Sequence, residues 1–448
     1  MFFRSTRDLF GARCRISLVL GVALLWPLLP AQAAPATPVS LHEAIRMGVR
    51  RAPALDARRA QLTAAEQEGV RAGALPDPTL MVGIENWPVT GADAFALDAD
   101  MMTMQRFGVR QEFPARSKRE ARQRLASRNV DQAEALALAE RLAVQRAVAE
   151  AWINAWAAHR ELDALRALRE EAALASRLTR ARVAGGGDSA AEALGAEAAV
   201  LELDNRLQAL EADLRGAQAT LERWVGEGAT VDREASTAFA SLPTQQASLL
   251  ANLDRLGPVL AWQARLEAVA AEVDMARAEK SPDWSVSASY GQRRGGASDM
   301  LMLEFAIDLP LFTANRQDRG IAAREAEYHA ALASREDARR ILAAEILRRV
   351  AEWEGLLGQT RRDREQLLPL ARDRSAVALA AYGGGATLQP WLAARRDELE
   401  TITVHAGRLR ALGQVWAALA FLLPGSSPGM TPPESTEAFD AVEPGALR

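Results

Sequence analysis

Residues 115–184 contain neither glycine nor proline, and they read ARSKREARQRLASRNVDQAEALALAERLAVQRAVAEAWINAWAAHRELDALRALREEAALASRLTRARVA. Alanine, leucine, arginine and glutamate dominate this stretch, and all are strong helix formers. The stretch therefore predicts one helix that, at 1.5 Å rise per residue, extends roughly 100 Å. Residues 313–382 predict a helix of nearly the same length, in which four residues allow bends: Gly320, Gly355, Gly358 and Pro369. Shorter helices are predicted over 41–49, 54–74 and 250–279.

A second helix returns after each long helix, over about 189–225 and 387–422. Both returning helices carry apolar residues at alternating spacings of three and four, which is the seam of a coiled coil. The seam of the first is formed by Val200, Leu203, Leu207, Leu210, Leu214, Ala217, Leu221 and Trp224. The seam of the second is formed by Ile402, His405, Leu409, Leu412, Trp416 and Leu419. Antiparallel helices of this length indicate a tube or a rod rather than a globular domain.

Two halves of the chain follow one plan at a spacing of 198 residues. Phe107 matches Phe305, and the glycine triplet 185–187 matches the triplet 383–385. Pro76-Asp77 matches Pro282-Asp283 at a spacing of 206, so the difference of eight residues falls within one loop. We therefore predict an internal twofold repeat of domain size, with a first repeat over 34–245 and a second over 246–423.

The periodicity changes from helical to alternating just after each Pro-Asp pair. Leu80, Val82 and Ile84 share one face of a strand pair at about 78–113, and a second pair is predicted at about 284–312. The second pair places Leu301, Leu303, Phe305 and Ile307 on one face. Four strands of roughly ten residues, apolar on one side and polar on the other, fit the transmembrane β-strand pattern.

Four strands cannot close into a barrel, and an open sheet edge is not stable in lipid. A membrane barrel therefore requires strands from several copies of the chain, and three copies would supply twelve. The alternative is two solvent-exposed hairpins at the end of a helical rod. The fold class that we predict is mainly α with a small β part: long coiled-coil helices forming an α-barrel, and four strands contributed to a trimeric, 12-stranded transmembrane β-barrel.

The first 33 residues predict a cleaved signal peptide. Four arginines precede the apolar run 16–29, and Ala31-Gln32-Ala33 is a small-residue cleavage site. A membrane anchor is the alternative, but the run is shorter than the roughly 20 residues of a span and contains Pro27. Removal of 1–33 leaves 50 basic and 57 acidic residues, a net charge of −7, and no cysteine, since Cys14 is the only one. Disulfides and thiolate sites are therefore excluded, and no basic excess points to nucleic acid. Residues 424–448 predict a disordered tail.

With these features in order, residues 38–423 resemble the TolC-like outer-membrane efflux family. The resemblance rests on Leu41-His42-Glu43-Ala44-Ile45, Ala52-Pro53-Ala54-Leu55, Pro76-Asp77-Pro78, Pro310-Leu311-Phe312 and the two helix-turn-helix tips, 182–187 and 381–385. It implies a homotrimer in the outer membrane of a Gram-negative bacterium, with a large periplasmic extension. It also implies a periplasmic adaptor protein and an inner-membrane pump of the resistance-nodulation-division type as partners. Residues 106–114 with Ser117-Lys118-Arg119 are similar to the branch that serves cation and heavy-metal pumps.

The resemblance implies that the tips dock onto the adaptor. The residues concerned are Gly185, Gly186, Gly187, Asp188, Gly383, Gly384, Gly385 and Thr387. The alternative is that the glycines are only helix C-caps, but three in a row, twice, suggest a turn that also admits a neighbouring backbone closely. Asp188 and Ser189 are expected to form the N-cap of one returning helix, and Thr387 that of the other.

Some family members carry a lipidated N-terminal cysteine or a ring of aspartates past the second tip, and this chain has neither. The charged candidates for a constriction are instead Glu192, Glu197, Arg395 and Arg396.

Methionines at two matching pairs of positions are expected to share the polar face of the strands with Arg106, Arg110, Glu304 and Asp308: Met102, Met104, Met300 and Met302. Thioethers suit soft Cu(I), whereas the plainer interpretation is that methionine fills irregular space.

The sequence contains no other candidate for chemistry. The four histidines (His42, His159, His329 and His405) are scattered, and no nucleophile, phosphate or cofactor motif is present. We predict a passive exit duct that exports small molecules or metal cations and is not an enzyme. The alternative is a soluble periplasmic coiled-coil adaptor or scaffold, for which the apolar strand faces have no use.

Overall fold

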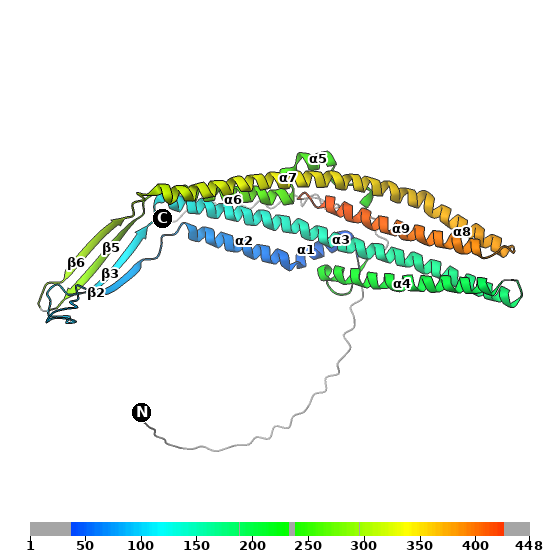
Figure 1. Ribbon diagram of the computed structural model, residues 1–448, viewed down its shortest axis with the longest axis horizontal. Helices are drawn as coiled ribbons and strands as arrows, with labels where there is room; N and C mark the ends of the chain where they lie inside the picture. The colour runs from blue at the N-terminus through cyan, green and yellow to red at the C-terminus, as the bar shows by residue number, and fades with distance from the viewer. Residues whose placement is uncertain (1–36, 188, 233–237, 295, 425–448) are drawn as a thin grey trace, which may run out of the picture.

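The computed structural model describes residues 37–187, 189–232, 238–294 and 296–424. The chain is a long rod with a β-sheet at one end and two helical turns at the other (Figure 1). The predicted signal peptide, Asp188 and the predicted tail beyond residue 424 lie outside the described residues.

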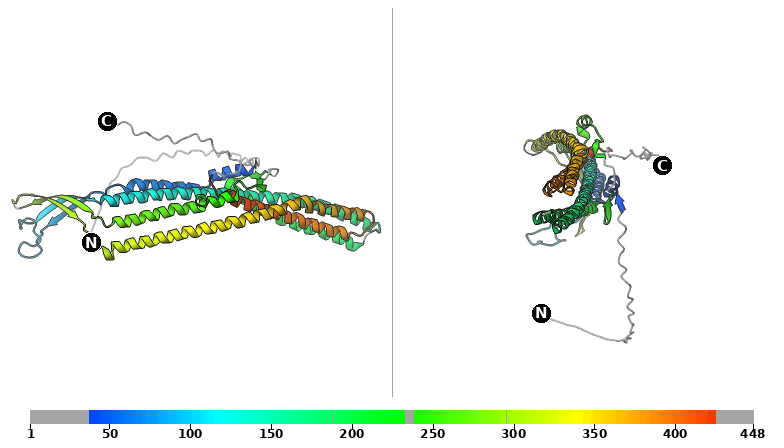
Figure 2. Two further views of the ribbon diagram at one scale, coloured as in Figure 1. Left: turned by 90° about the horizontal axis from the view of Figure 1, so that it is seen from above. Right: turned by 90° about the vertical axis from the view of Figure 1, so that its right-hand side faces the viewer.

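Helix α3 (Arg116–Ala184) has 69 residues without a break and confirms the helix predicted from the glycine-free stretch. It is the centre of the rod. Towards the sheet it packs against α2 (Pro53–Ala72) and α6 (Gly257–Ala278), and towards the far end against α4 (Ala190–Val225) and α9 (Gln389–Ala420). All these helices run nearly along the rod axis (Figure 2).

The second long helical segment is divided. Helix α7 (Gln317–Arg362) follows a short 3₁₀ turn, η3 (Thr313–Asn315), and leads into a π-helical segment, η4 (Asp363–Leu367), and then α8 (Leu368–Gly383). Pro369 is the second residue of α8, two positions after the end of the π segment. A proline has no N–H and its ring collides with the carbonyl four residues earlier in an α-helix, so a wider turn just before it relieves both problems.

The core is a series of apolar layers along the rod. In the far half, seam residues of α4 such as Leu203 and Leu210 are buried against Leu162, Leu165 and Leu168 of α3. The predicted seam therefore packs as expected. In the middle of the rod, four aromatic residues lie together in the largest layer: Trp152, Trp156, Phe239 and Trp416.

This middle layer includes a parallel strand pair that the sequence analysis did not predict. Strand β1 (Thr37–Val39) pairs with β4 (Ala229–Val231), beside helix α1 (Leu41–Arg51). The buried indole N–H of Trp152 donates to the carbonyl of Val39 at 2.8 Å. The remaining short elements are η1 (Ala238–Ala240), α5 (Gln246–Ala251) and η2 (Leu253–Arg255).

The sheet at the end of the rod has four antiparallel strands in the order β2-β3-β5-β6. They are β2 (Thr79–Glu85), β3 (Met104–Phe113), β5 (Trp284–Arg293) and β6 (Met300–Ile307). The two predicted hairpins therefore join through β3 and β5, with Phe107 opposite Tyr290. Strands β2 and β6 are the free edges of this sheet within the single chain.

The two faces of the sheet differ as the alternation predicts. One face carries exposed apolar side chains, among them Leu80 (73% exposed), Leu301 (73%) and Leu303 (75%). The registers place these residues on the same side, since Val109 lies opposite Leu80 and Ala288 lies opposite both Val109 and Leu303.

In the described residues, no helix combines enough length with enough apolar character to cross a membrane.

Candidate functional site

The opposite face of the sheet is polar and has an arginine at its centre. The Arg106 guanidinium forms an ion pair with Glu85 on β2, lies 3.9 Å from the Glu304 carboxylate on β6, and donates to the Ser289 hydroxyl on β5 at 2.9 Å. Arg110 donates to the Ser285 hydroxyl at 3.0 Å. One polar surface therefore extends across all four strands.

Methionines adjoin this polar surface around a glycine. A Cβ built on Gly291 would lie 2.6 Å from the Met104 sulfur and 3.4 Å from the Met302 methyl carbon, and Gly291 is paired with Met300 in the sheet. The methionines thus fill the space that the glycine leaves, which supports the packing interpretation. Met102 precedes strand β3 and is 59% exposed, so it is not a strand residue like the other three. Met81 on β2 shares the polar face, since it pairs with Gly108, although it was not among the four candidate methionines.

The first helical turn at the far end of the rod, between α3 and α4, is a Schellman motif. Gly186 has φ +75°, its N–H donates to Val183 at 3.0 Å, and the Gly187 N–H donates to Arg182 at 2.8 Å. Only Gly186 needs the left-handed conformation that glycine tolerates. Ser189 then caps α4 and forms a capping box with Glu192, as predicted for Ser189.

The second turn, between α8 and α9, has the same motif one residue later in the repeat. Gly385 has φ +99°, its N–H donates to Tyr382 at 3.1 Å, and the Ala386 N–H donates to Ala381 at 3.0 Å. At the spacing of 198 residues, Gly186 corresponds to Gly384 and not to Gly385. The prediction that Thr387 caps α9 is wrong, because the N-cap residue is Leu388 and no side chain caps it.

Four side chains fasten the two turns to each other. The Arg182 guanidinium donates to the Tyr382 carbonyl at 2.6 Å and lies 4.3 Å from the centre of its ring. The Tyr382 hydroxyl, buried at the helix interface, donates to the Thr179 hydroxyl at 3.1 Å. The Glu192 carboxylate accepts from the Leu388 N–H at 3.1 Å.

The four proposed constriction charges lie in different surroundings. Glu192 is occupied by the cap, and hydrogen bonds from the Ser189 and Leu388 backbone lower its pKa. Glu197 pairs with Arg180 of α3 at 3.0 Å. Arg395 is largely buried and pairs with Glu171 and Glu398. Arg396 is exposed.

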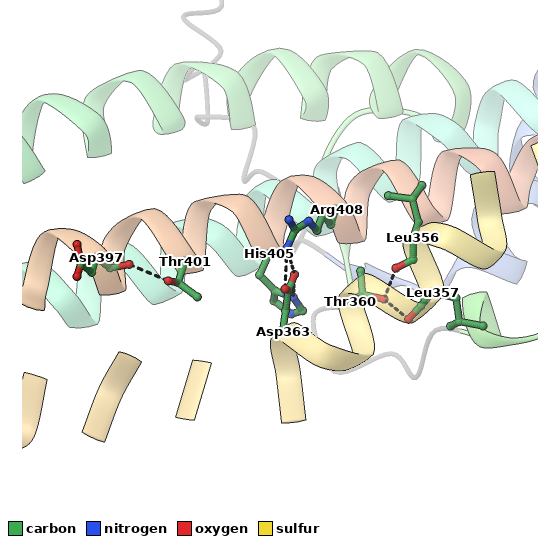
Figure 3. A network of polar contacts seen from close by, with 8 residues as sticks. All are labelled: Leu356, Leu357, Thr360, Asp363, Asp397, Thr401, His405 and Arg408. Atoms are coloured by element: carbon green, nitrogen blue, oxygen red, sulfur yellow. Dashed lines mark hydrogen bonds and ion pairs between the residues drawn. The ribbon is translucent and has the colours of Figure 1, made fainter. Parts of the chain in front are cut away.

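A buried polar cluster marks the π segment. The Asp363 carboxylate, 2% exposed, accepts from Arg408 at 2.6 Å and 2.8 Å and lies 3.4 Å from His405 Nδ1 (Figure 3). Burial lowers the pKa of His405, as do Arg160 and Arg408, while Asp363 acts in the opposite direction. His405 occupies its place in the predicted seam but makes polar contacts there. Within the part of the chain that the structure describes, no three His, Cys, Asp or Glu side chains form a group that could hold a metal ion.

Residues 45–227 match the sequence model of the family described as outer membrane efflux protein. The resemblance to this family is therefore confirmed over residues 45–227 of the chain. No curated protein gives a significant sequence match to this chain.

The fold of this chain is similar to that of several solved structures. A membrane protein from Pseudomonas aeruginosa has a TM-score of 0.74 and 18% identity, covering 88% of this chain and 92% of that chain. CusC, described in terms of transmembrane channel formation, has 0.72 and 14%, covering 86% and 92%. The outer membrane protein VceC from Vibrio cholerae has 0.68 and 22%, covering 85% and 94%.

This family match supports three predictions: a place in the outer membrane with a periplasmic extension, a role in efflux, and a passive channel component rather than an enzyme. The sequence analysis missed Thr179 and Tyr382, which the structure brings together at the two turns. Neither carries a local motif, because their meeting depends on the packing of α8 against α3.

Proposed function

We propose that three copies of this efflux protein form one continuous exit duct. The observation that supports this most strongly is the sheet: β2 and β6 are free edges, and one face is a broad exposed apolar surface. Lipid stabilises an apolar surface but not an unpaired strand edge. Three sheets closing edge to edge meet both conditions, with twelve strands in a β-barrel and the long helices in a periplasmic α-barrel.

The polar sheet face then lines the barrel. Arg106, Glu85 and Glu304 bring charges of both signs to this lining, which suits a water-filled passage more than a selective filter for one charge. Cargo selection therefore rests chiefly with the pump that feeds the duct.

The helical turns are the proposed contact with a periplasmic adaptor. Only Gly186 and Gly385 are needed for the turns themselves, so the remaining four glycines have no conformational requirement. Within the described residues, no atom lies within 4 Å of a Cβ built on Gly186, Gly383 or Gly385. The bare backbone is therefore open to a partner protein, and we extend the proposal to Asp188 and Thr387 beside the triplets. Among the constriction candidates, Glu197 and Arg396 are the exposed charges that such a contact can move.

Membrane extraction tests the duct against the soluble scaffold. We expect the protein to stay in the outer-membrane fraction after washing with high salt and to come out in detergent as a trimer. Release by salt alone, or a monomer stable in plain buffer, would contradict the proposal. Loss of this gene should also sensitise the cell to exported compounds, and a comparison of metals with dyes and detergents identifies the cargo class.

A soft-metal cargo is the second candidate, and it rests on the methionines on and beside the polar sheet face. Replacing Met102, Met104, Met300 and Met302 with leucine keeps their volume and removes the sulfur. The candidate predicts lower copper tolerance and higher copper retention in the variant. Unchanged values for both would leave packing as the only role of these methionines.

A further inference from the structure

The junction between sheet and helices contains an ion pair that joins the two halves of the chain. Asp283, just before β5, accepts from the backbone N–H of Ala115 at 2.7 Å and from the Lys118 ammonium at 2.7 Å. Ala115 immediately precedes α3, and Lys118 lies in its first turn, with its side chain 9% exposed. This contact exists because β5 and β3 are neighbours in the sheet, and α3 continues from β3.

The sequence repeat carries both members of this pair a second time. At the spacing of 206 residues Asp283 corresponds to Asp77, just before β2. At the spacing of 198 residues Lys118 corresponds to Arg316, just before α7. An acidic residue therefore recurs at the position equivalent to Asp283, and a basic residue recurs at the position equivalent to Lys118.

Within the single chain, the second pair cannot form. Strand β2 and strand β6 are the two opposite edges of the sheet, so Asp77 and the start of α7 lie at opposite sides of it. Asp77 and Arg316 are both exposed, and the side chain of neither has a hydrogen bond or an ion pair among the described residues. Two opposite charges at the two free edges are complementary for edge-to-edge association of identical chains.

The strand register supports this arrangement. If β6 and β2 of adjacent copies pair as β3 and β5 do, Ile307 lies opposite Val82 and Phe305 lies opposite Ile84, by transfer of the Val109–Ala288 and Phe107–Tyr290 pairs. These four residues all belong to the exposed apolar face of the sheet. The apolar face of one copy would therefore continue into the apolar face of the next copy. A shift by one residue would reverse it.

We infer that Asp77 of one copy pairs with Arg316 of the neighbouring copy, as Asp283 pairs with Lys118 inside each chain. This inference rests on the proposed trimer and specifies the contact that closes it at the sheet–helix junction. We expect this contact between copies to be made by the two side chains alone. The 3₁₀ turn η3 precedes α7, so the backbone there differs from the backbone at the start of α3.

Cross-linking between copies tests the pair directly. In a Cys14→Ser background the variant Asp77→Cys/Arg316→Cys has two thiols, and we expect a short bis-maleimide to convert it into covalent dimers and trimers on a denaturing gel. A bis-maleimide is chosen because an Arg–Asp pair separates the backbones further than a disulfide tolerates. Each single-cysteine variant should remain monomeric on the gel.

The matched control is Asp77→Cys/Arg340→Cys. Arg340 is also exposed on α7, but it lies roughly 36 Å further along the helix at 1.5 Å per residue, and it should give no cross-link. A native trimer that fails to cross-link through Asp77→Cys/Arg316→Cys overturns the inference and leaves the duct intact. A wild-type protein that is monomeric in detergent overturns the proposed function itself.

Exchange of the charges gives an independent measurement. Asp77→Arg and Arg316→Asp alone should each raise the dissociation constant of the trimer by about fivefold per contact, the upper range for an exposed pair. The double exchange should restore most of the loss. A double variant that is no better than the worse single variant also overturns the pairing.

Discussion

The two long helical segments of this chain lie at the predicted spacing of 198 residues but differ in continuity. Helix α3 runs through 69 residues without interruption, whereas the α7–α8 segment contains five residues of π-helix. At the spacing of 198 residues, Leu165 of α3 corresponds to Asp363 at the start of that π segment. Leu165 is buried among leucines, and Asp363 is equally buried but held by Arg408 and His405.

In this comparison, the continuous α-helix has an apolar residue at the compared position. The π-helical segment has a carboxylate there, and this carboxylate needs polar partners. A buried carboxylate is costly unless it is paired and hydrogen-bonded. Asp363 meets this condition by facing Arg408 on α9. The contact of the π segment with α9 is therefore a buried ion pair, whereas Leu165 at the corresponding position of α3 lies in an apolar layer shared with α4.

The largest effect is expected from removal of the Asp363 carboxylate. Asp363→Ala leaves the Arg408 guanidinium and His405 without their partner in a mainly buried place, and we expect a loss of about 3 kcal/mol in the free energy of unfolding. Loss of the helical circular dichroism signal in urea measures it. Leu165→Ala is the matched change in α3 and should cost about as much, since it creates a cavity in the apolar seam.

The triple variant Asp363→Leu/His405→Leu/Arg408→Leu distinguishes the two mechanisms. Replacing a whole buried polar set with apolar residues is often neutral or stabilising, so the triple variant should be more stable than Asp363→Ala. If it is less stable, the polar set is needed for the π-helical geometry itself and the seam cannot be made continuous.

Local sequence patterns predicted most of the fold. Helix α3 was predicted within one residue at its start because it has no breaker, and the four strands followed from alternating residues such as Leu80 and Val82. The π segment was not predicted, although Pro369 was recognised as a place for a bend. A proline determines where the α-helical hydrogen-bonding pattern is interrupted. Whether a kink or a π-helical segment results depends on the side chains of α9 that pack there.

The roles of individual site residues were harder to predict. Glu192 and Arg395 were selected as candidate charges of a constriction, yet Glu192 caps a helix and Arg395 pairs with Glu171. Both roles depend on side chains that are close in space but far apart in sequence. Strands β1 and β4 were missed for the same reason, since each has only three residues and gains its hydrogen bonds from the other.

The second largest effect is expected at the two turns, where a single glycine in each has a positive φ. Gly186→Ala and Gly385→Ala should each cost about 1–2 kcal/mol, because a Cβ is unfavourable in the left-handed region. Gly185→Ala and Gly384→Ala are the matched controls, with φ of −86° and −80°, and should be neutral or slightly stabilising. Equal losses at Gly384 and Gly385 would show that the second turn follows the repeat spacing and not the one-residue shift.

A smaller effect is expected from the contact that joins the turns. Tyr382→Phe removes one buried hydrogen bond to Thr179 and keeps the ring beneath Arg182, so we expect a loss of about 1 kcal/mol. Hydrogen exchange of residues near the turns should report faster opening of α8 from α3. Thr179→Val is the matched change on the other partner, and the two changes combined should cost little more than either alone if they act through one bond. Full additivity would mean that the two side chains contribute separately.

The smallest effect is the contribution of His405 to the pH dependence of stability. Its pKa is lowered in the folded protein, chiefly by burial, whereas an unfolded histidine has a pKa of about 6.5. The folded state therefore binds fewer protons, and stability is lost as pH falls from about 6.5 towards the lower folded pKa, with no contribution at higher pH. The charged groups around His405 are Asp363, Arg408 and Arg160.

His405→Leu should remove this contribution of His405 to the pH dependence. The unfolding midpoint of the wild type should therefore fall more than that of the variant between pH 7 and pH 5. Carboxylates elsewhere titrate in both proteins and cancel in the comparison. Parallel curves would mean that the Asp363 carboxylate offsets the effect of burial on the pKa of His405. The buried cluster of Asp363, His405 and Arg408 would then contribute no pH dependence through His405.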